Sequence, residues 1–346
     1  MQHTKHIISS SRKSTTQSIS TRILIVFIIS LILLSTLIEA APPSKRNNKV
    51  SVQELKELER FANYASAAYC KPSDFLKWDC GPICDATKGT KVSKFITTKN
   101  EIQVFIATLN EEKSIIVSYR GTVPENVKNL ITDAKLALID YPPVKNAKVH
   151  IGFYQAFLEV QSDVFNEIQK LHKTNPEYKI VFSGHSLGGA LTLLSALDLL
   201  QNSKDFTKDK NNLFVFTYGE PRVGNSEFAK YVDSKLTVTR TVNGGDPIAR
   251  LPPRFIGYKP HNNELWISNP TKSSFEVVKC DGPEDKKCSL SVSILKLNLS
   301  FHSGPYYGIS MRACKDFRKT QSVADEPELK KAYDGLGGNL KGKNNF

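Results

Sequence analysis

The chain has 346 residues, which is enough for one large domain with appendages or for two average domains. Its 40% hydrophobic and 23% charged residues are typical of a globular protein and exclude a largely disordered one. The net charge is +13, but the sequence shows no basic face interleaved with aromatic residues, so we expect no nucleic-acid partner.

The first 40 residues differ in composition from the rest. A polar stretch with four basic residues leads into an unbroken apolar run at residues 23–38, and small residues follow it. This order is typical of a secretory signal peptide, so we expect residues 1–40 to be removed and the protein to be secreted. The alternative is an uncleaved signal anchor, because the run is only slightly shorter than a bilayer span. Residues 41–49 are expected to be a short propeptide or linker with a dibasic site at Lys45-Arg46.

Six cysteines in an exported chain indicate disulfides. Spacing favours two local pairs and leaves two cysteines to join the ends of the folded region: Cys80–Cys84, Cys280–Cys288 and Cys70–Cys314. Zinc binding at the first local pair is the alternative reading. No second close pair of cysteines or histidines has metal-ligand spacing, so we expect no metal.

After the apolar run, strand-like segments alternate with helical patterns. Helices are predicted at residues 52–68, 153–171 and 187–200. Strands are predicted at residues 101–108, 114–119, 178–182, 213–218 and 236–242. This order predicts an α/β fold with a central, mostly parallel sheet and helices on its faces. In such sheets the functional residues gather at the carboxyl ends of the strands.

A Gly-x-Ser-x-Gly motif lies between a predicted strand and a predicted helix. Its residues are Gly184, His185, Ser186, Leu187 and Gly188. In this context the motif predicts a nucleophile elbow, a strained turn that presents the serine hydroxyl above the edge of the sheet. The two glycines leave room for neighbouring backbone. The alternative is an ordinary serine at the start of a helix.

A nucleophilic serine requires a carboxylate and a base, which follow it in the order Ser, Asp or Glu, His. Asp246 is the best-placed acid, because it lies in a glycine- and proline-containing loop just after the last predicted strand. Other aspartates beyond Ser186 lie in polar connections or in the pattern of the following helix.

Two histidines follow Ser186, His261 and His302. His302 is preferred as the base because it ends the apolar run at residues 294–301, which we expect to be a strand. His261 lies in a proline-containing loop and is the alternative base. Neither His150 nor His185 fits the order, because both precede the serine.

Six segments of the chain resemble the class 3 lipase family, in particular the secreted fungal lipases of the Rhizomucor and Rhizopus type. The segments are YRGT (119–122), VHIGF (149–153), SGHSLGGA (183–190), YGEPRVGN (218–225), NGGDPIARLPP (243–253) and FHSGPYYGI (301–309). Their order implies an α/β-hydrolase domain at about residues 50–314. Residues 315–346 extend beyond it as a charged C-terminal extension that we expect to be flexible.

The resemblance implies roles for the residues singled out above. It assigns the catalytic triad to Ser186, Asp246 and His302, and the oxyanion hole to the backbone amides of Thr122 and Leu187. The resemblance also makes the remaining downstream histidine, in GYKPHNNELWI, a structural residue and supports the three disulfides. The reaction passes through an acyl-enzyme, and no metal or organic cofactor is expected.

In the resembling lipases a short helical lid follows the position of Thr122 and opens at an oil surface. Here the corresponding segment is residues 123–144. Its apolar residues at helical spacing are Val123, Val127, Leu130 and Ile131. The alternative is a fixed surface helix with the same apolar face.

The resemblance therefore implies a secreted, monomeric enzyme that hydrolyses long-chain triacylglycerols at a lipid–water interface. Feruloyl esterases and other esterases for soluble substrates share the fold and the triad, and are the alternative within enzymes. An inactive, membrane-anchored binding protein is the alternative from another class. The presence of the complete triad and of the Thr122 loop argues against it.

Overall fold

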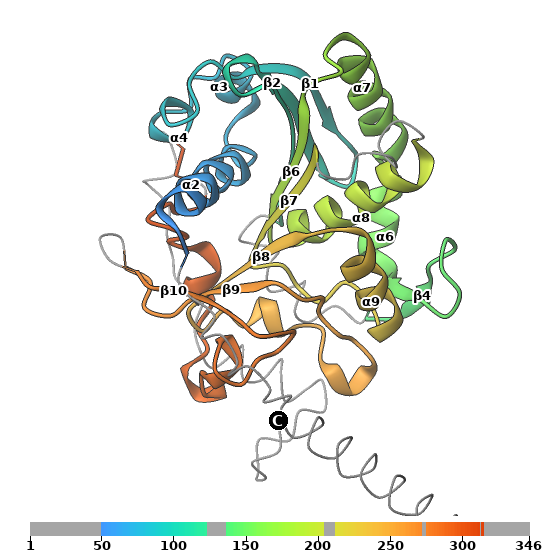
Figure 1. Ribbon diagram of the computed structural model, residues 1–346, viewed down its shortest axis with the longest axis vertical. Helices are drawn as coiled ribbons and strands as arrows, with labels where there is room; N and C mark the ends of the chain where they lie inside the picture. The colour runs from blue at the N-terminus through green and yellow to red at the C-terminus, as the bar shows by residue number, and fades with distance from the viewer. Residues whose placement is uncertain (1–49, 123–135, 204–211, 272–274, 312, 315–346) are drawn as a thin grey trace, which may run out of the picture. The chain divides into compact units, whose positions relative to one another are not determined.

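The computed structural model describes residues 50–122, 136–203, 212–271, 275–311 and 313–314 (Figure 1). All of them belong to one unit of the chain, residues 48–346. The predicted signal peptide, propeptide and C-terminal extension lie outside the described residues, as do the lid residues Val123, Val127, Leu130 and Ile131. No helix among the described residues is long and apolar enough to cross a membrane.

The core of the fold is an eight-stranded sheet with the order β1-β2-β3-β6-β7-β8-β9-β10. The strands are β1 (Lys91–Thr97), β2 (Gln103–Leu109), β3 (Ser114–Tyr119), β6 (Lys179–His185), β7 (Leu213–Tyr218), β8 (Val238–Asn243), β9 (Glu264–Ile267) and β10 (Val277–Lys279). Strands β3, β6, β7, β8 and β9 run parallel, and the strands at both edges are antiparallel to their neighbours. A separate antiparallel pair joins β4 (Leu138–Asp140) to β5 (Lys148–His150). The mostly parallel sheet confirms the predicted fold class.

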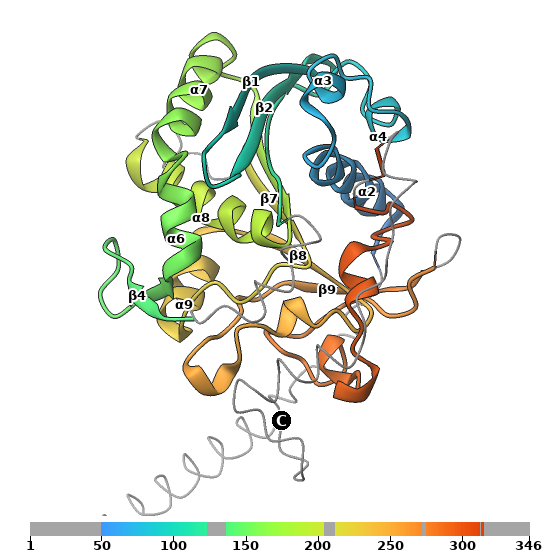
Figure 2. The ribbon, with the colours of Figure 1, turned by 180° about the vertical axis from the view of Figure 1, so that it is seen from behind.

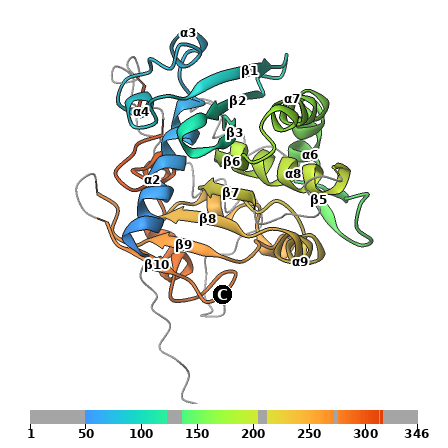
Figure 3. The same cartoon turned by 45° about the horizontal axis from the view of Figure 1, so that its top comes forward.

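Helices cover both faces of this sheet (Figures 2 and 3). One face carries α2 (Val52–Ala67) with the short helices α3 (Pro72–Phe75) and α4 (Pro82–Asp85). The opposite face carries α6 (Ile151–Leu158), α7 (Gln161–Thr174), α8 (Leu187–Asn202) and α9 (Ser226–Lys235). The sheet is therefore buried on two sides, which is the usual environment of parallel strands.

Successive side chains of β6 enter different cores, because neighbouring residues of a strand point to opposite faces. Ile180 and Phe182 pack in the core beneath α6, α7 and α8, whereas Val181 packs in the core beneath α2. Ser183 also faces α2, and its hydroxyl donates to the carbonyl oxygen of Phe61 at 2.8 Å. This double burial explains the apolar, β-branched composition of the strand that leads to Ser186.

Several elements differ from the sequence-based prediction. The helix expected at residues 153–171 is broken into α6 and α7, because the chain turns where Val160 enters the core. Strands β1, β9 and β10, the β4–β5 pair and helix α9 were not predicted. Residues 294–301 do not form a strand. They contain two 3-10 turns, η6 (Ile294–Lys296) and the first residues of η7 (Leu299–Ser303), and Leu295 is 73% exposed, so the apolar run does not reflect burial in a sheet.

Three disulfides join all six cysteines, in the pairs expected: Cys70–Cys314, Cys80–Cys84 and Cys280–Cys288. The sequence separation is 244 residues for the first pair and 4 for the second. Since the sulfurs of the second pair are bonded to each other, they offer no thiolate to zinc. The first pair ties the segment after α2 to the end of the described chain.

Replacement of Cys70 and Cys314 by alanine should destabilise the protein more than the same replacement of Cys80 and Cys84. In the chain-entropy model the longer loop is worth about 5 kcal/mol and the shorter about 2 kcal/mol. Both pairs are buried, so the loss of packing is similar. Denaturant unfolding of the two double variants measures the difference. Equal losses would contradict the loop-length account.

Candidate active site

Ser186 lies in a strained turn between β6 and α8. Its backbone has φ 59° and ψ −131°, which residues with a side chain rarely adopt. A Cβ atom on Gly184 would collide with the carbonyl oxygen of Gly188, and one on Gly188 would collide with that of Tyr119. The motif therefore needs both glycines, because strand, turn and helix approach one another through backbone atoms.

Two hydrogen bonds join the predicted nucleophile, base and acid in one chain. His302 Nε2 lies 2.8 Å from Ser186 Oγ, and His302 Nδ1 lies 2.9 Å from Asp246 Oδ2. All three side chains are buried. The alternative base, His261, lies elsewhere: its Nε2 is 3.1 Å from Glu220 Oε1, in a separate buried pair.

The parallel sheet brings the serine and the acid to the same edge. Ser186 follows β6, and Asp246 follows β8, so both lie at carboxyl ends of strands that flank β7. Asp246 Oδ1 accepts the backbone N–H of Ile248 at 2.8 Å, which fixes the carboxylate within its loop. His302 comes from η7 and reaches this edge from outside the sheet.

Tyr306 completes the surroundings of the acid. Its hydroxyl lies 3.4 Å from Asp246 Oδ2 and 3.3 Å from the carbonyl oxygen of His302. Burial, with the nearby Asp246 charge, raises the pKa of Tyr306 well above its ordinary value. The hydroxyl therefore keeps its proton and can donate it in hydrogen bonds. Sequence reasoning did not single out Tyr306, whose only signal was its position four residues after His302.

The two predicted oxyanion donors lie on either side of the serine. Leu187 is the first residue of α8, and the first amides of a helix have no acceptor within it. The helix dipole adds partial positive charge at this end. On the other side, a Cβ atom on Gly121 would lie 2.9 Å from Ser186 Cβ, so the loop that carries Thr122 touches the serine. Thr122 Oγ1 is buried and has no hydrogen-bond partner among the described residues.

This arrangement can perform acyl transfer. Ser186 can pass its proton to His302 as it attacks a carbonyl, and Asp246 can orient the imidazole and stabilise its charged form. The amide of Leu187 and the groups of Thr122 can donate to the oxyanion that forms. Nothing in these steps calls for a metal ion.

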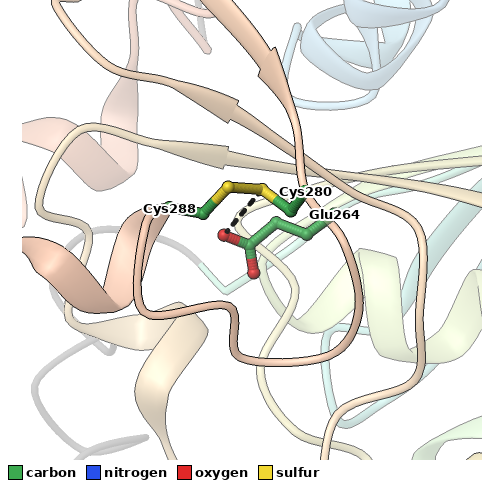
Figure 4. A group of neighbouring side chains, drawn as sticks. All are labelled: Glu264, Cys280 and Cys288. Atoms are coloured by element: carbon green, nitrogen blue, oxygen red, sulfur yellow. Dashed lines mark hydrogen bonds between the residues drawn. A yellow bond between two sulfur atoms is a disulfide. The ribbon is translucent and has the colours of Figure 1, made fainter. Parts of the chain in front are cut away.

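One cluster of potential metal ligands occurs among the described residues, away from this site. The carboxylate of Glu264 and the sulfurs of Cys280 and Cys288 lie within 4.8 Å of one another (Figure 4). The two sulfurs form a disulfide and so are not thiolates. Glu264 Oε2 forms an ion pair with the Arg240 guanidinium at 2.7 Å. The chemistry of these donors therefore does not fit a metal ion.

Comparisons with known proteins point in one direction. The family model "Lipase (class 3)" matches residues 116–256. A lipase of Rhizomucor miehei is 35% identical over 265 residues, which cover 76% of this chain and 71% of that protein. A secreted mono- and diacylglycerol lipase of Fusarium solani is 32% identical over 252 residues, which cover 69% of this chain and 73% of that protein.

A solved structure extends the similarity to the fold. It is a triacylglycerol lipase described as having a serine protease triad at its catalytic centre. The TM-score is 0.70 and the identity 35%, and the match covers 77% of this chain and 98% of that one. The comparisons confirm the resemblance that the sequence motifs indicated.

Gly188→Ala should destabilise the protein much more than Gly189→Ala. The new methyl group at residue 188 meets the backbone of Tyr119 and Arg120, which cannot move aside, and about 3 kcal/mol of unfolding free energy should be lost. At residue 189 the nearest atom, Glu220 Cβ, is 3.2 Å away and has to shift by only a few tenths of an ångström, so much less strain is expected. Denaturant unfolding of both variants checks the difference. Similar stabilities would contradict the close-approach argument.

Proposed function

Because the chain belongs to the class 3 lipase family, we propose that it is a lipase that hydrolyses triacylglycerols and related carboxylic esters. The observation that carries the proposal is the buried chain of hydrogen bonds from Ser186 through His302 to Asp246, with Ser186 in a strained strand-to-helix turn. The lipases to which the chain is similar act on acylglycerols, which supports this class of substrate.

In the proposed mechanism, His302 acts first as a general base. It accepts the proton of Ser186 as the hydroxyl oxygen attacks the ester carbonyl. The amides of Thr122 and Leu187 hold the tetrahedral oxyanion. The Thr122 hydroxyl, which has no partner within the part of the chain that the structure describes, is a further donor. His302 then returns the proton to the leaving alcohol. Water repeats the cycle on the acyl-enzyme and releases a carboxylic acid.

Access to the serine requires a movement. Ser186 is 0% exposed, so an ester cannot reach its hydroxyl in this conformation. Residues 123–144 begin directly after Thr122 and carry the apolar residues predicted for a lid. The end of this segment is fixed, since β4 (Leu138–Asp140) pairs with β5 and Tyr141 is buried in the core. We propose that displacement of the part before β4 at a lipid–water interface uncovers the triad and presents an apolar mouth to long acyl chains. A lipid surface is then the partner of the enzyme.

The same proposal includes export. Residues 1–40 have the composition of a signal peptide, and the three disulfides suit an oxidising compartment. Removal of residues 41–49 as a propeptide would leave residues 50–314 as the lipase domain, followed by the extension at residues 315–346. The enzyme acts as a secreted monomer without a cofactor.

Hydrolysis of an emulsified long-chain triacylglycerol tests the function. The rate of the wild-type protein should rise sharply as the substrate passes its solubility limit, because an interface then becomes available. Ser186→Ala should lower turnover by about 10⁶-fold. Asp246→Asn should lower it by about 10⁴-fold, because His302 loses the acceptor that sets its tautomer.

Each other outcome has a defined meaning. Activity confined to dissolved esters would retain the triad but identify an esterase for soluble substrates. Absence of hydrolysis, with no labelling of Ser186 by a fluorophosphonate, would refute the enzyme and favour a binding protein.

A further inference from the structure

A second chain of hydrogen bonds ends at the backbone carbonyl of the catalytic histidine, His302. The Tyr69 hydroxyl lies 2.6 Å from His185 Nδ1, and His185 Nε2 lies 2.6 Å from the carbonyl oxygen of His302. All three residues are buried. This chain of hydrogen bonds runs from Tyr69, just after α2, through His185 to the backbone of His302.

The donor and the acceptor of each bond can be assigned by starting from the carbonyl oxygen of His302. A carbonyl oxygen can only accept, so we assign the proton of that bond to His185 Nε2. A neutral imidazole then presents a lone pair at Nδ1, and the Tyr69 hydroxyl donates to it. One backbone carbonyl therefore fixes the tautomer of His185.

A neutral His185 also suits the charge that develops during the reaction. The rings of His185 and His302 are 4.5 Å apart between centroids. When His302 takes the proton of Ser186 it becomes a cation, and a second cation at this distance would oppose that step.

His302 needs external support because its own segment is irregular. It lies in η7, a five-residue 3-10 turn, and the next residue but one, Gly304, has φ 101°. Its ring must meet Ser186 and Asp246 at the same time, so a shift of its backbone would lengthen at least one of these bonds. A second donor to the same carbonyl, the Tyr306 hydroxyl, lies farther away at 3.3 Å.

Tyr69 is itself held in place from two directions. The next residue, Cys70, is bonded to Cys314, beyond the η7 turn. On the other side the Tyr69 hydroxyl packs against Gly121, where a Cβ atom would collide with it. Tyr69 therefore contacts the loop that carries Thr122 and also belongs to the chain of hydrogen bonds that ends at His302.

We propose that Tyr69 and His185 are positioning residues that hold the backbone of His302 in the geometry required for proton transfer. We call the pair the Tyr69–His185 brace. The inference rests on the proposed hydrolase function, and adds to it two residues outside the triad and the oxyanion hole.

Tyr69→Phe tests the brace, because it removes one hydroxyl and little else. With a soluble ester such as p-nitrophenyl butyrate, kcat should fall about tenfold while KM stays unchanged, because the loss affects proton transfer rather than binding. Labelling of Ser186 by a fluorophosphonate should slow by a similar factor. Tyr64→Phe is the matched control, because Tyr64 is also a buried tyrosine of this region and its hydroxyl bonds Thr90 at 2.7 Å, away from the triad.

Substitution of His185 supplies a second test. His185→Gln keeps an N–H group that can donate to the His302 carbonyl, whereas His185→Leu does not. The Gln variant should therefore retain a higher kcat than the Leu variant. Equal loss in both would assign the Tyr69 effect to its contact with Gly121 and overturn the brace.

The outcomes separate the two proposals. If the wild-type protein is active and Tyr69→Phe matches Tyr64→Phe in kcat, the brace is refuted and the hydrolase function stands. A rise in KM with unchanged kcat would make Tyr69 a substrate contact, and would also refute the brace. A wild-type protein that hydrolyses no ester, with Ser186 unlabelled, refutes the function itself.

Discussion

The close packing of backbone around Ser186 is the constraint on which the site depends. Strand β6, helix α8 and the end of β3 meet where only glycine fits at residues 184 and 188. This approach forces the positive φ of Ser186 and directs its hydroxyl toward His302. The same packing brings the Thr122 loop against the serine and leaves the first amide of α8 beside it. Nucleophile and oxyanion donors are therefore products of one local geometry.

The acid and the base are held by contacts of a different kind. Asp246 lies in the loop after β8, and Arg222 supports the chain that follows, with its guanidinium donating to the carbonyl oxygen of Pro252 at 2.8 Å. Arg222 is itself buried and paired with Glu284. Removal of the Glu284 carboxylate would leave the buried Arg222 guanidinium without its acidic partner, which is costly. The loop that follows the acid is thus fixed by a buried ion pair instead of by regular secondary structure.

The base is the least regular part of the site and the most dependent on distant residues. Its turn is linked to the end of α2 by the Cys70–Cys314 disulfide and by the contacts of Tyr69 and His185. Tyr69 and His185 are 116 positions apart in the sequence, and His185 and His302 are 117 apart. The segment after α2 therefore belongs to the architecture of the active site, although it contributes none of the triad.

The sequence by itself determined the fold class, the elbow at Ser186, the order of acid and base, and the cysteine pairs. These features leave local patterns: β-branched runs buried on both faces, glycines at fixed spacing, and short separations within two cysteine pairs, which leave the remaining two cysteines to pair with each other. The edge strands β1 and β10 and the break between α6 and α7 leave no such pattern. Residues 294–301 misled the prediction because apolar side chains in an exposed turn resemble those of a strand. The contacts of Tyr69, His185 and Tyr306 with the triad were decided only by the tertiary structure, because they join segments whose proximity no local periodicity encodes.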